Sequence, residues 1–444
     1  MRLVQRIPGG WFSLGTACRL AALAGLLAGC GDPAAPGTTP GTGGQTGSGG
    51  AADDGIGGAA AGVGGKIATP DAGGQGGSSA DGGGPDLRGS GGGPAPGTGG
   101  LAGGAGGRTG TGGSGGSAPP VGPNPDATTR ARCTGVDPIE CHFGGAPGNY
   151  DVTVVLGGAA AGRTLVQAER FRTMLAPVAT AAGQTQRFTF TVNVREPEGE
   201  PIQPVPAGTP GLDLYFLGQG GLPPQLQSIG FAAVARPFMI YVGGDSTVCD
   251  QPTLDYGGWA QQVPQHFNYP VSIANYADSG ESSGSFLGSG SLFGAIESRL
   301  KAGDWVLLQF GHNDKTNTAA DFHDNLTAMV TRSKAKGAFP VLITPVARAQ
   351  FNGTTVAPQH INGTGANLPM IVKQVASEQN VPVLDLTART VEWLMVLGPS
   401  GWQQYHALGT DVTHTNPAGA EVEAGFVRDL IRAANLTALT ALMR

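Results

Sequence analysis

Short segments in which apolar and polar residues alternate occupy the middle of the chain. Residues 150–156 read YDVTVVL, and similar segments rich in β-branched residues lie at 164–168, 188–194 and 212–216. Gly- and Pro-containing turns separate these segments, and no long helical period interrupts them. Short alternating strands at this spacing predict a small β-sandwich domain over residues 131–236. Such a domain binds sugar or serves as a scaffold packed on its neighbour, and the pattern leaves both open.

From residue 237 onward, buried strands alternate with amphipathic helices. Apolar strand segments are expected at 238–242, 271–275, 305–310, 341–344 and 381–385, and helices at 257–267, 291–301, 320–336 and 369–379. A last helix begins with Asn416 as its N-cap and Pro417 at its first position. This alternation predicts a parallel sheet with helices on both faces over residues 237–444. Its active site should lie at the carboxyl ends of the strands.

The first thirty residues have the pattern of an export signal. Arg2 and Arg6 form a positive end, and the apolar stretch at 20–27 is far too short to span a bilayer. The segment ends Leu-Ala-Gly-Cys30, which resembles a bacterial lipobox. We therefore expect residues 1–30 to be a lipoprotein signal peptide and Cys30 to carry lipid. Gly31 favours the outer membrane or cell surface, and an ordinary signal peptide with a chance Cys30 is the alternative.

Composition separates the next hundred residues from the rest. The chain has 78 Gly and 33 Pro, and they concentrate between residues 31 and 130. A segment this poor in apolar residues cannot offset the entropy of ordering, so we predict a disordered linker. The net charge of −6 and the absence of a basic block argue against nucleic acid as a partner.

The cysteines agree with export. Cys133 and Cys141 lie close together in a loop-like stretch, and a disulfide between them is plausible in an oxidising compartment. Cys249 is then a free, buried thiol. The spacings do not fit a metal site.

Four polar motifs follow predicted strands or precede the last helix. Ser246 stands on a tight turn after the first strand, where its hydroxyl and backbone N–H are both available. Gly280 follows the second strand, and Asn313 follows the third, where a side-chain amide can point at an oxyanion. Asp411 lies three residues before His414, a spacing that places a carboxylate against one imidazole nitrogen. Each motif alone has an ordinary structural explanation as a helix cap or turn.

Together the motifs resemble those of the SGNH, or GDSL-like, hydrolases. Ser246, Gly280, Asn313 and His414 fall on the four signature positions, in the expected order. GDSTVCDQ, SGESSGSF, AGDWVLLQFGHND and DVTHTNPAGAEVEA are closest to the rhamnogalacturonan acetylesterases of carbohydrate esterase family 12. The resemblance implies a three-layer α/β/α, flavodoxin-like fold. It also implies a Ser246–His414–Asp411 triad, an oxyanion hole of Ser246, Gly280 and Asn313, an acetylated polysaccharide substrate, and no metal or organic cofactor.

Some features leave alternatives. Relatives often have Arg where this chain has Glu281, which puts binding of an acidic, galacturonate-rich polymer in doubt. Arg348 and His360 could meet substrate instead, or face solvent from a loop. His312 is a rival base to His414. The competing functions are an esterase acting on acetylated xylan, another sugar or a lipid, and a non-catalytic surface protein that binds carbohydrate. The oligomeric state does not follow from the sequence.

Overall fold

The computed structural model describes residues 122–196, 198–202 and 209–444. The expected signal peptide, the lipidation site Cys30 and the linker as far as residue 121 lie outside the described residues. Within the described part of the chain, every helix is too short or too polar to cross a bilayer.

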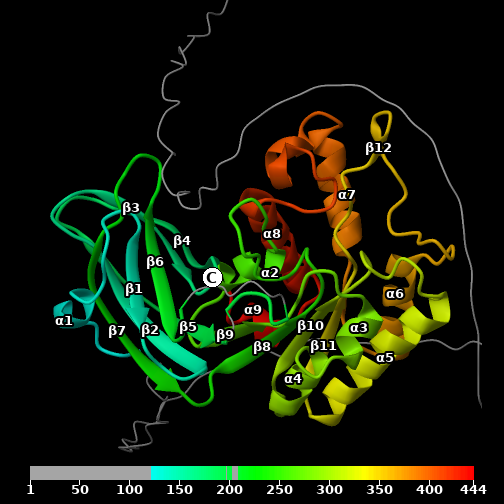
Figure 1. The fold of residues 1–444 in the computed structure, drawn as a ribbon, viewed down its shortest axis with the longest axis horizontal. Helices are drawn as coiled ribbons and strands as arrows, with labels where there is room; N and C mark the ends of the chain where they lie inside the picture. Colours follow the sequence, from blue (N-terminus) through cyan, green and yellow to red (C-terminus); the bar gives the residue numbers. More distant parts are fainter. Residues whose placement is uncertain (1–121, 197, 203–208) are drawn as a thin grey trace, which may run out of the picture. The chain divides into compact units, whose positions relative to one another are not determined.

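Two antiparallel sheets form the first half of the described chain (Figure 1). A short helix, α1 (Ala127–Arg130), precedes them. One sheet has the strand order β1-β6-β3-β4 and the other β5-β2-β7. Their bounds are β1 (Ile139–Phe143), β2 (Gly148–Gly157), β3 (Gly162–Ala168), β4 (Arg172–Thr180), β5 (Thr185–Val194), β6 (Leu212–Gly218) and β7 (Leu226–Val234). The four predicted strands lie within β2, β3, β5 and β6, and alternating side chains such as Val152, Val154 and Leu156 fill one shared core.

A parallel sheet forms the second half, with the strand order β14-β11-β10-β8-β9. Its strands are β8 (Phe238–Gly243), β9 (Val271–Asn275), β10 (Trp305–Gln309), β11 (Phe339–Ile343) and β14 (Val383–Leu384). Each lies at a predicted strand position. A two-stranded hairpin of β12 (Phe351–Asn352) and β13 (Thr355–Val356) projects after β11.

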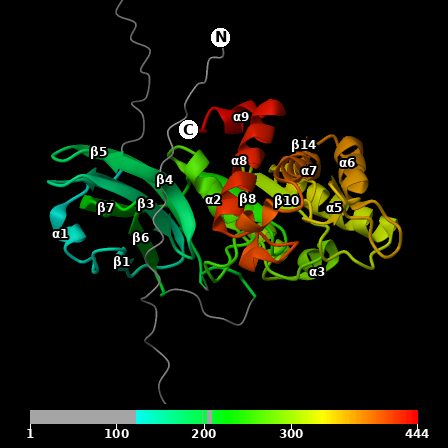
Figure 2. The ribbon, with the colours of Figure 1, turned by 90° about the horizontal axis from the view of Figure 1, so that it is seen from above.

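Helices cover both faces of this sheet, as the alternation predicted. One face carries α3 (Ser283–Gly288), α4 (Phe293–Arg299), α5 (Ala319–Ala335) and α6 (Leu368–Glu378). The other carries α2 (Trp259–Gln262), α7 (Leu386–Leu397), α8 (Pro417–Ala433) and α9 (Thr437–Thr440). The view from above separates α8 and α9 from α3 (Figure 2). Single-turn helices η1 (Val263–His266), η2 (Trp402–Tyr405) and η3 (Ala407–Gly409) complete the set.

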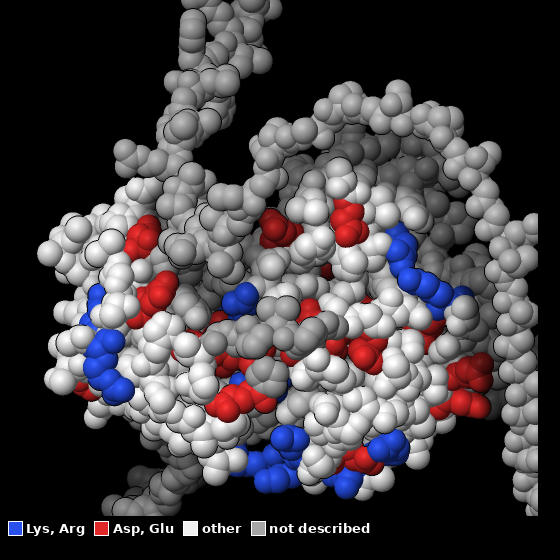
Figure 3. Space-filling model, in the orientation of Figure 1, with Lys and Arg blue, Asp and Glu red and all other residues white. Residues whose placement is uncertain are grey.

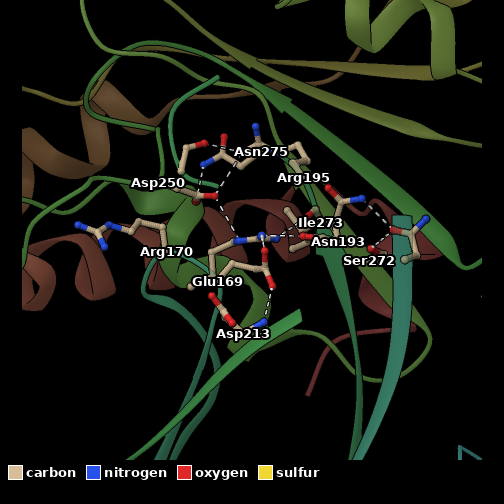
Figure 4. A network of polar contacts seen from close by, with 12 residues as sticks. Glu169, Arg170, Asn193, Arg195, Asp213, Asp250, Ser272, Ile273 and Asn275 are labelled. Atoms are coloured by element: carbon tan, nitrogen blue, oxygen red, sulfur yellow. Dashed lines mark hydrogen bonds and ion pairs between the residues drawn. The ribbon is translucent and has the colours of Figure 1, made fainter. Parts of the chain in front are cut away.

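A buried polar network joins the two sheet systems (Figure 4). Arg172 of β4 is 2% exposed, and its Nε lies 3.2 Å from Asp250 Oδ2 in the loop after β8. Asp250 also accepts a hydrogen bond from Asn275 at the end of β9. Because removing one partner of a buried ion pair is costly, these contacts fix the loop that carries Ser246 against the antiparallel sheets.

Candidate active site

The loop after β8 holds Ser246 at the carboxyl edge of the sheet. A Cβ on Gly244 would lie 2.6 Å from Val248 Cγ2, so the chain needs glycine for this tight approach. Asp245 accepts hydrogen bonds from the backbone and hydroxyl of Thr247, which closes the turn. Gln251 Nε2 donates to the Ser246 carbonyl at 2.6 Å. These contacts hold the Ser246 side chain at the wall of a pocket.

A chain of two short polar contacts runs from Ser246 to Asp411. Ser246 Oγ lies 2.9 Å from His414 Nε2, and His414 Nδ1 lies 2.8 Å from Asp411 Oδ2. Asn416 caps α8 by accepting from Gly419 N, and the helix begins at Pro417, three residues after His414. The structure therefore brings Ser246 to a His–Asp pair that lies far from it in the sequence.

Hydrogen bonds favour the charged form of Asp411. Its partial burial raises the pKa, but the His414 side chain and the backbone N–H groups of His414 and Thr413 outweigh that effect and hold the pKa below its usual value. His406 Nδ1 lies 2.8 Å from the Asp411 carbonyl oxygen, and the Tyr256 ring packs edge-on against His414. The turn from Asp411 to His414 is thus fixed on several sides.

Gly280 and Asn313 line the same pocket as Ser246. Gly280 has φ +83°, a conformation that glycine adopts freely, and nothing lies within 4 Å of the position of a Cβ there. Asn313 Nδ2 donates to the Glu281 carbonyl at 3.2 Å. Among the described residues, the backbone N–H groups of Ser246 and Gly280 donate no hydrogen bond. Donors from three loops therefore border one space.

The pocket has a volume of about 550 Å³ and includes a wall that the sequence did not predict. Glu200, from the loop after β5, accepts hydrogen bonds from Ser279 Oγ at 2.8 Å and from Cys249 Sγ at 3.3 Å. Burial raises the pKa of its carboxyl. Gln251, Thr253 and Tyr256 also line the pocket. The alternation of apolar and polar residues predicts the strands of the β domain, but it does not indicate that a loop between them reaches this site.

The remaining predicted residues have other positions. His312 is 2% exposed, with Nδ1 3.3 Å from Asp245 Oδ2. Arg348 donates to Thr413 Oγ1 and to the His312 carbonyl, and His360 Nε2 contacts the Val346 carbonyl at 2.7 Å. Arg348 and His360 are half-buried and brace the loops around the site, and neither lines the pocket that contains Ser246.

The cysteines and Glu281 also have defined surroundings. A disulfide joins Cys133 and Cys141 in the first half of the described chain, and Cys249 is free and buried. Glu281 follows Gly280, and partial burial raises the pKa of its carboxyl.

Known proteins match the half of the chain that carries this site. The model of the GDSL-like Lipase/Acylhydrolase family matches residues 242–422. A rhamnogalacturonan acetylesterase of Bacillus subtilis is 34% identical over 198 residues, which cover 43% of this chain and 83% of that protein. The chain belongs to the GDSL-like lipase/acylhydrolase family. A GDSL-like domain with these relatives makes the protein an ester hydrolase.

Two further known proteins are similar to this chain. A probable rhamnogalacturonan acetylesterase of Bacillus subtilis is 30% identical over 204 residues, which cover 42% of this chain and 89% of that protein. A solved structure of another Bacillus subtilis protein has a TM-score of 0.42 and 25% identity, and covers 67% of this chain and 80% of that one. The family match confirms the expected GDSL-like, or SGNH, family. The parallel sheet with helices on both faces confirms the expected α/β fold.

Proposed function

We propose that this GDSL-like protein is a serine esterase that removes acetyl groups from a plant-type polysaccharide, rhamnogalacturonan. The hydrogen-bonded series from Ser246 through His414 to Asp411, at the wall of an open pocket, carries the proposal. The names of the two Bacillus subtilis relatives support the choice of ester and polymer.

The first half of the reaction forms an acetyl-enzyme. His414 Nε2 takes the Ser246 proton as Oγ attacks the ester carbonyl carbon, since a neutral hydroxyl is a poor nucleophile. Asp411 keeps Nδ1 of His414 protonated and stabilises the imidazolium that forms. When the tetrahedral intermediate collapses, the C–O bond to the sugar breaks. His414 then returns the proton to the departing sugar hydroxyl.

Hydrogen-bond donors must already be in place where the oxyanion will form. The backbone N–H groups of Ser246 and Gly280 border the pocket, and the Asn313 amide has a second N–H besides the one given to Glu281. Losing one such donor typically lowers kcat by about 10²–10³-fold. In the second half-reaction His414 removes a proton from water, whose oxygen attacks the acetyl carbonyl. Ser246 Oγ leaves with that proton, and acetate is released.

The test compares the full chain with its Ser246→Ala variant for acetate release. The substrates are acetylated rhamnogalacturonan, acetylated xylan and p-nitrophenyl esters of increasing chain length. Release from rhamnogalacturonan that disappears in Ser246→Ala is the expected result. If Ser246-dependent release occurs only from xylan or only from long-chain esters, the esterase mechanism stands but the substrate is not rhamnogalacturonan. The absence of any Ser246-dependent release would overturn the esterase mechanism.

A further inference from the structure

A second cavity lies between the antiparallel sheets and the parallel sheet. Its volume is about 770 Å³, larger than that of the catalytic pocket. The end of β5, the start of β8 and helix α4 contribute its walls. We call it the interdomain cleft. Concave sites at domain junctions are common places for ligands.

The interdomain cleft is lined by more positive than negative side chains. Arg195, Arg236, Arg299 and Lys301 line it, against Glu196 as the acidic residue. Lys and Arg side chains gather at the lower edge of the molecule, below β8 and α4 (Figure 3). An uncompensated group of cations in a hollow attracts and concentrates an anionic ligand.

Two of these cations have no carboxylate partner in the part of the chain that the structure describes. Arg236 pairs with Asp304 at 2.8 Å, but Arg299 contacts the Ala295 carbonyl and the Ser298 hydroxyl rather than a carboxylate. Among the described residues, no carboxylate lies within ion-pair distance of Arg299 or Lys301. Both side chains are exposed at the surface of the cleft. Their charges are available to a ligand.

An aromatic ring brings two guanidinium groups together in the same cleft. Arg195 and Arg299 lie 4.9 Å and 5.8 Å from the centre of the Tyr276 ring. Arg195 is buried, its Nε has no hydrogen-bond partner among the described residues, and its carboxylate contact, Asp250, is shared with Arg172 (Figure 4). The Tyr276 ring thus carries one buried and one exposed guanidinium group, and both residues line the cleft.

The interdomain cleft and the catalytic pocket share a wall. Glu200 lines the catalytic pocket, and the next residue, Pro201, lines the cleft. On the other side, Tyr276 lines the cleft and Ser279 the catalytic pocket. The two hollows therefore border the same two chain segments, which a polymer can span and a small free anion cannot.

We propose that the interdomain cleft binds the carboxylates of uronate residues in an acidic polysaccharide whose acetylated residue occupies the catalytic pocket. This inference rests on the proposed polysaccharide esterase function and assigns a site for the acidic residues of its substrate. Arg299 and Lys301 supply the cations. The cleft thereby provides the positive charge that is missing where Glu281 stands.

The experiment measures binding of unacetylated hexagalacturonate to the full chain by calorimetry. Because this probe contains no ester, its binding is measured independently of whether the protein is an esterase. The variants are Arg299→Gln with Lys301→Gln, the charge-preserving Arg299→Lys with Lys301→Arg, and a control, Lys334→Gln with Lys336→Gln. The control removes the same charge from the C-terminal end of α5, away from the cleft. Thermal unfolding checks that each variant is folded.

The proposal predicts a specific order of affinities. Wild type, the charge-preserving variant and the control bind hexagalacturonate, whereas the double Gln variant binds about tenfold more weakly. Binding of the wild type weakens as salt rises, and neutral xylohexaose binds poorly. No binding by wild type, equal binding by the double Gln variant, or equal affinity for xylohexaose would overturn the proposal. So would binding to phosphatidylglycerol vesicles but not to hexagalacturonate.

Discussion

Two histidine–aspartate pairs lie close to Ser246, and they differ in access to it. His414 and Asp411 have side chains 28% and 26% exposed, and His414 contacts Ser246 directly. His312 and Asp245 have side chains 1% and 0% exposed, and the His312 ring packs against His360. The residue types are the same in both pairs. This difference shows that pairing with an aspartate is not enough. To act as the general base, a histidine ring must also be accessible and must contact the serine hydroxyl.

The position of each histidine in the fold explains why the two pairs differ in exposure. His312 follows β10, a central strand buried along its whole length, and so it enters the interior beneath the catalytic loops. His414 stands in the turn before α8, which lies at the surface of the sheet's carboxyl edge. Arg348 connects the two, since it donates to Thr413 beside His414 and to the carbonyl of His312. Arg348 therefore links the segment of the buried His312 to the turn that carries Asp411 and His414.

Replacing each histidine in turn tests which of them is the general base, and it should give the largest effect. His414→Ala should lower kcat for p-nitrophenyl acetate by about 10⁴-fold or more, because Ser246 loses its base. His312→Ala should keep kcat within about tenfold of wild type, since His312 does not contact Ser246. Steady-state kinetics measures both. A large loss in His312→Ala with little loss in His414→Ala would reverse the assignment.

The stability of the same variants should show the opposite ranking. His312→Ala leaves the buried Asp245 carboxylate without its neighbour, which should cost about 1–3 kcal/mol in the free energy of unfolding. His414→Ala removes a partly exposed pair and should cost under about 1 kcal/mol. Urea unfolding followed by circular dichroism measures both values. Equal losses in the two variants would mean that burial does not distinguish the pairs.

The sequence predicted the exposed pair well and the buried one poorly. Asp411 and His414 lie three residues apart before a capped helix, a spacing that allows their contact, and the family resemblance assigned both to the triad. The His312–Asp245 contact joins the ends of two neighbouring strands, β10 and β8, and depends on their pairing in the sheet. Alternation of apolar residues locates strands, but it does not specify which polar residues meet beneath them.

The same limit applies to the β domain. The strand pattern predicted β2, β3, β5 and β6, and each lies where alternation placed it. It did not predict that Glu200 would line the catalytic pocket or that Arg172 would reach Asp250. Both contacts join the antiparallel sheets or their loops to the loops of the parallel sheet. Long-range charge pairing leaves no periodic signal in a single sequence, so these residues required the structure.

The acid dependence of stability gives the smallest and most discriminating test of the exposed pair. The pKa of Asp411 lies below its ordinary value of 3.8, so its ionised form stabilises the folded state. That contribution is fully present above the unfolded pKa and is lost as pH falls through the folded pKa. The free energy lost in Asp411→Asn should therefore be constant above about pH 5 and shrink below about pH 4.

The expected loss at neutral pH is under about 1 kcal/mol, because the Asp411 carboxyl is partly solvated. Urea unfolding of wild type and Asp411→Asn between pH 3 and pH 7 measures it. In a His414→Ala background the same substitution should cost less, since the imidazole hydrogen bond that favours the carboxylate is already gone. A cost that grows toward acid, or that is unchanged without His414, would show that His414 does not hold Asp411 in its charged form. The proposed base would then lack the partner that distinguishes it from His312.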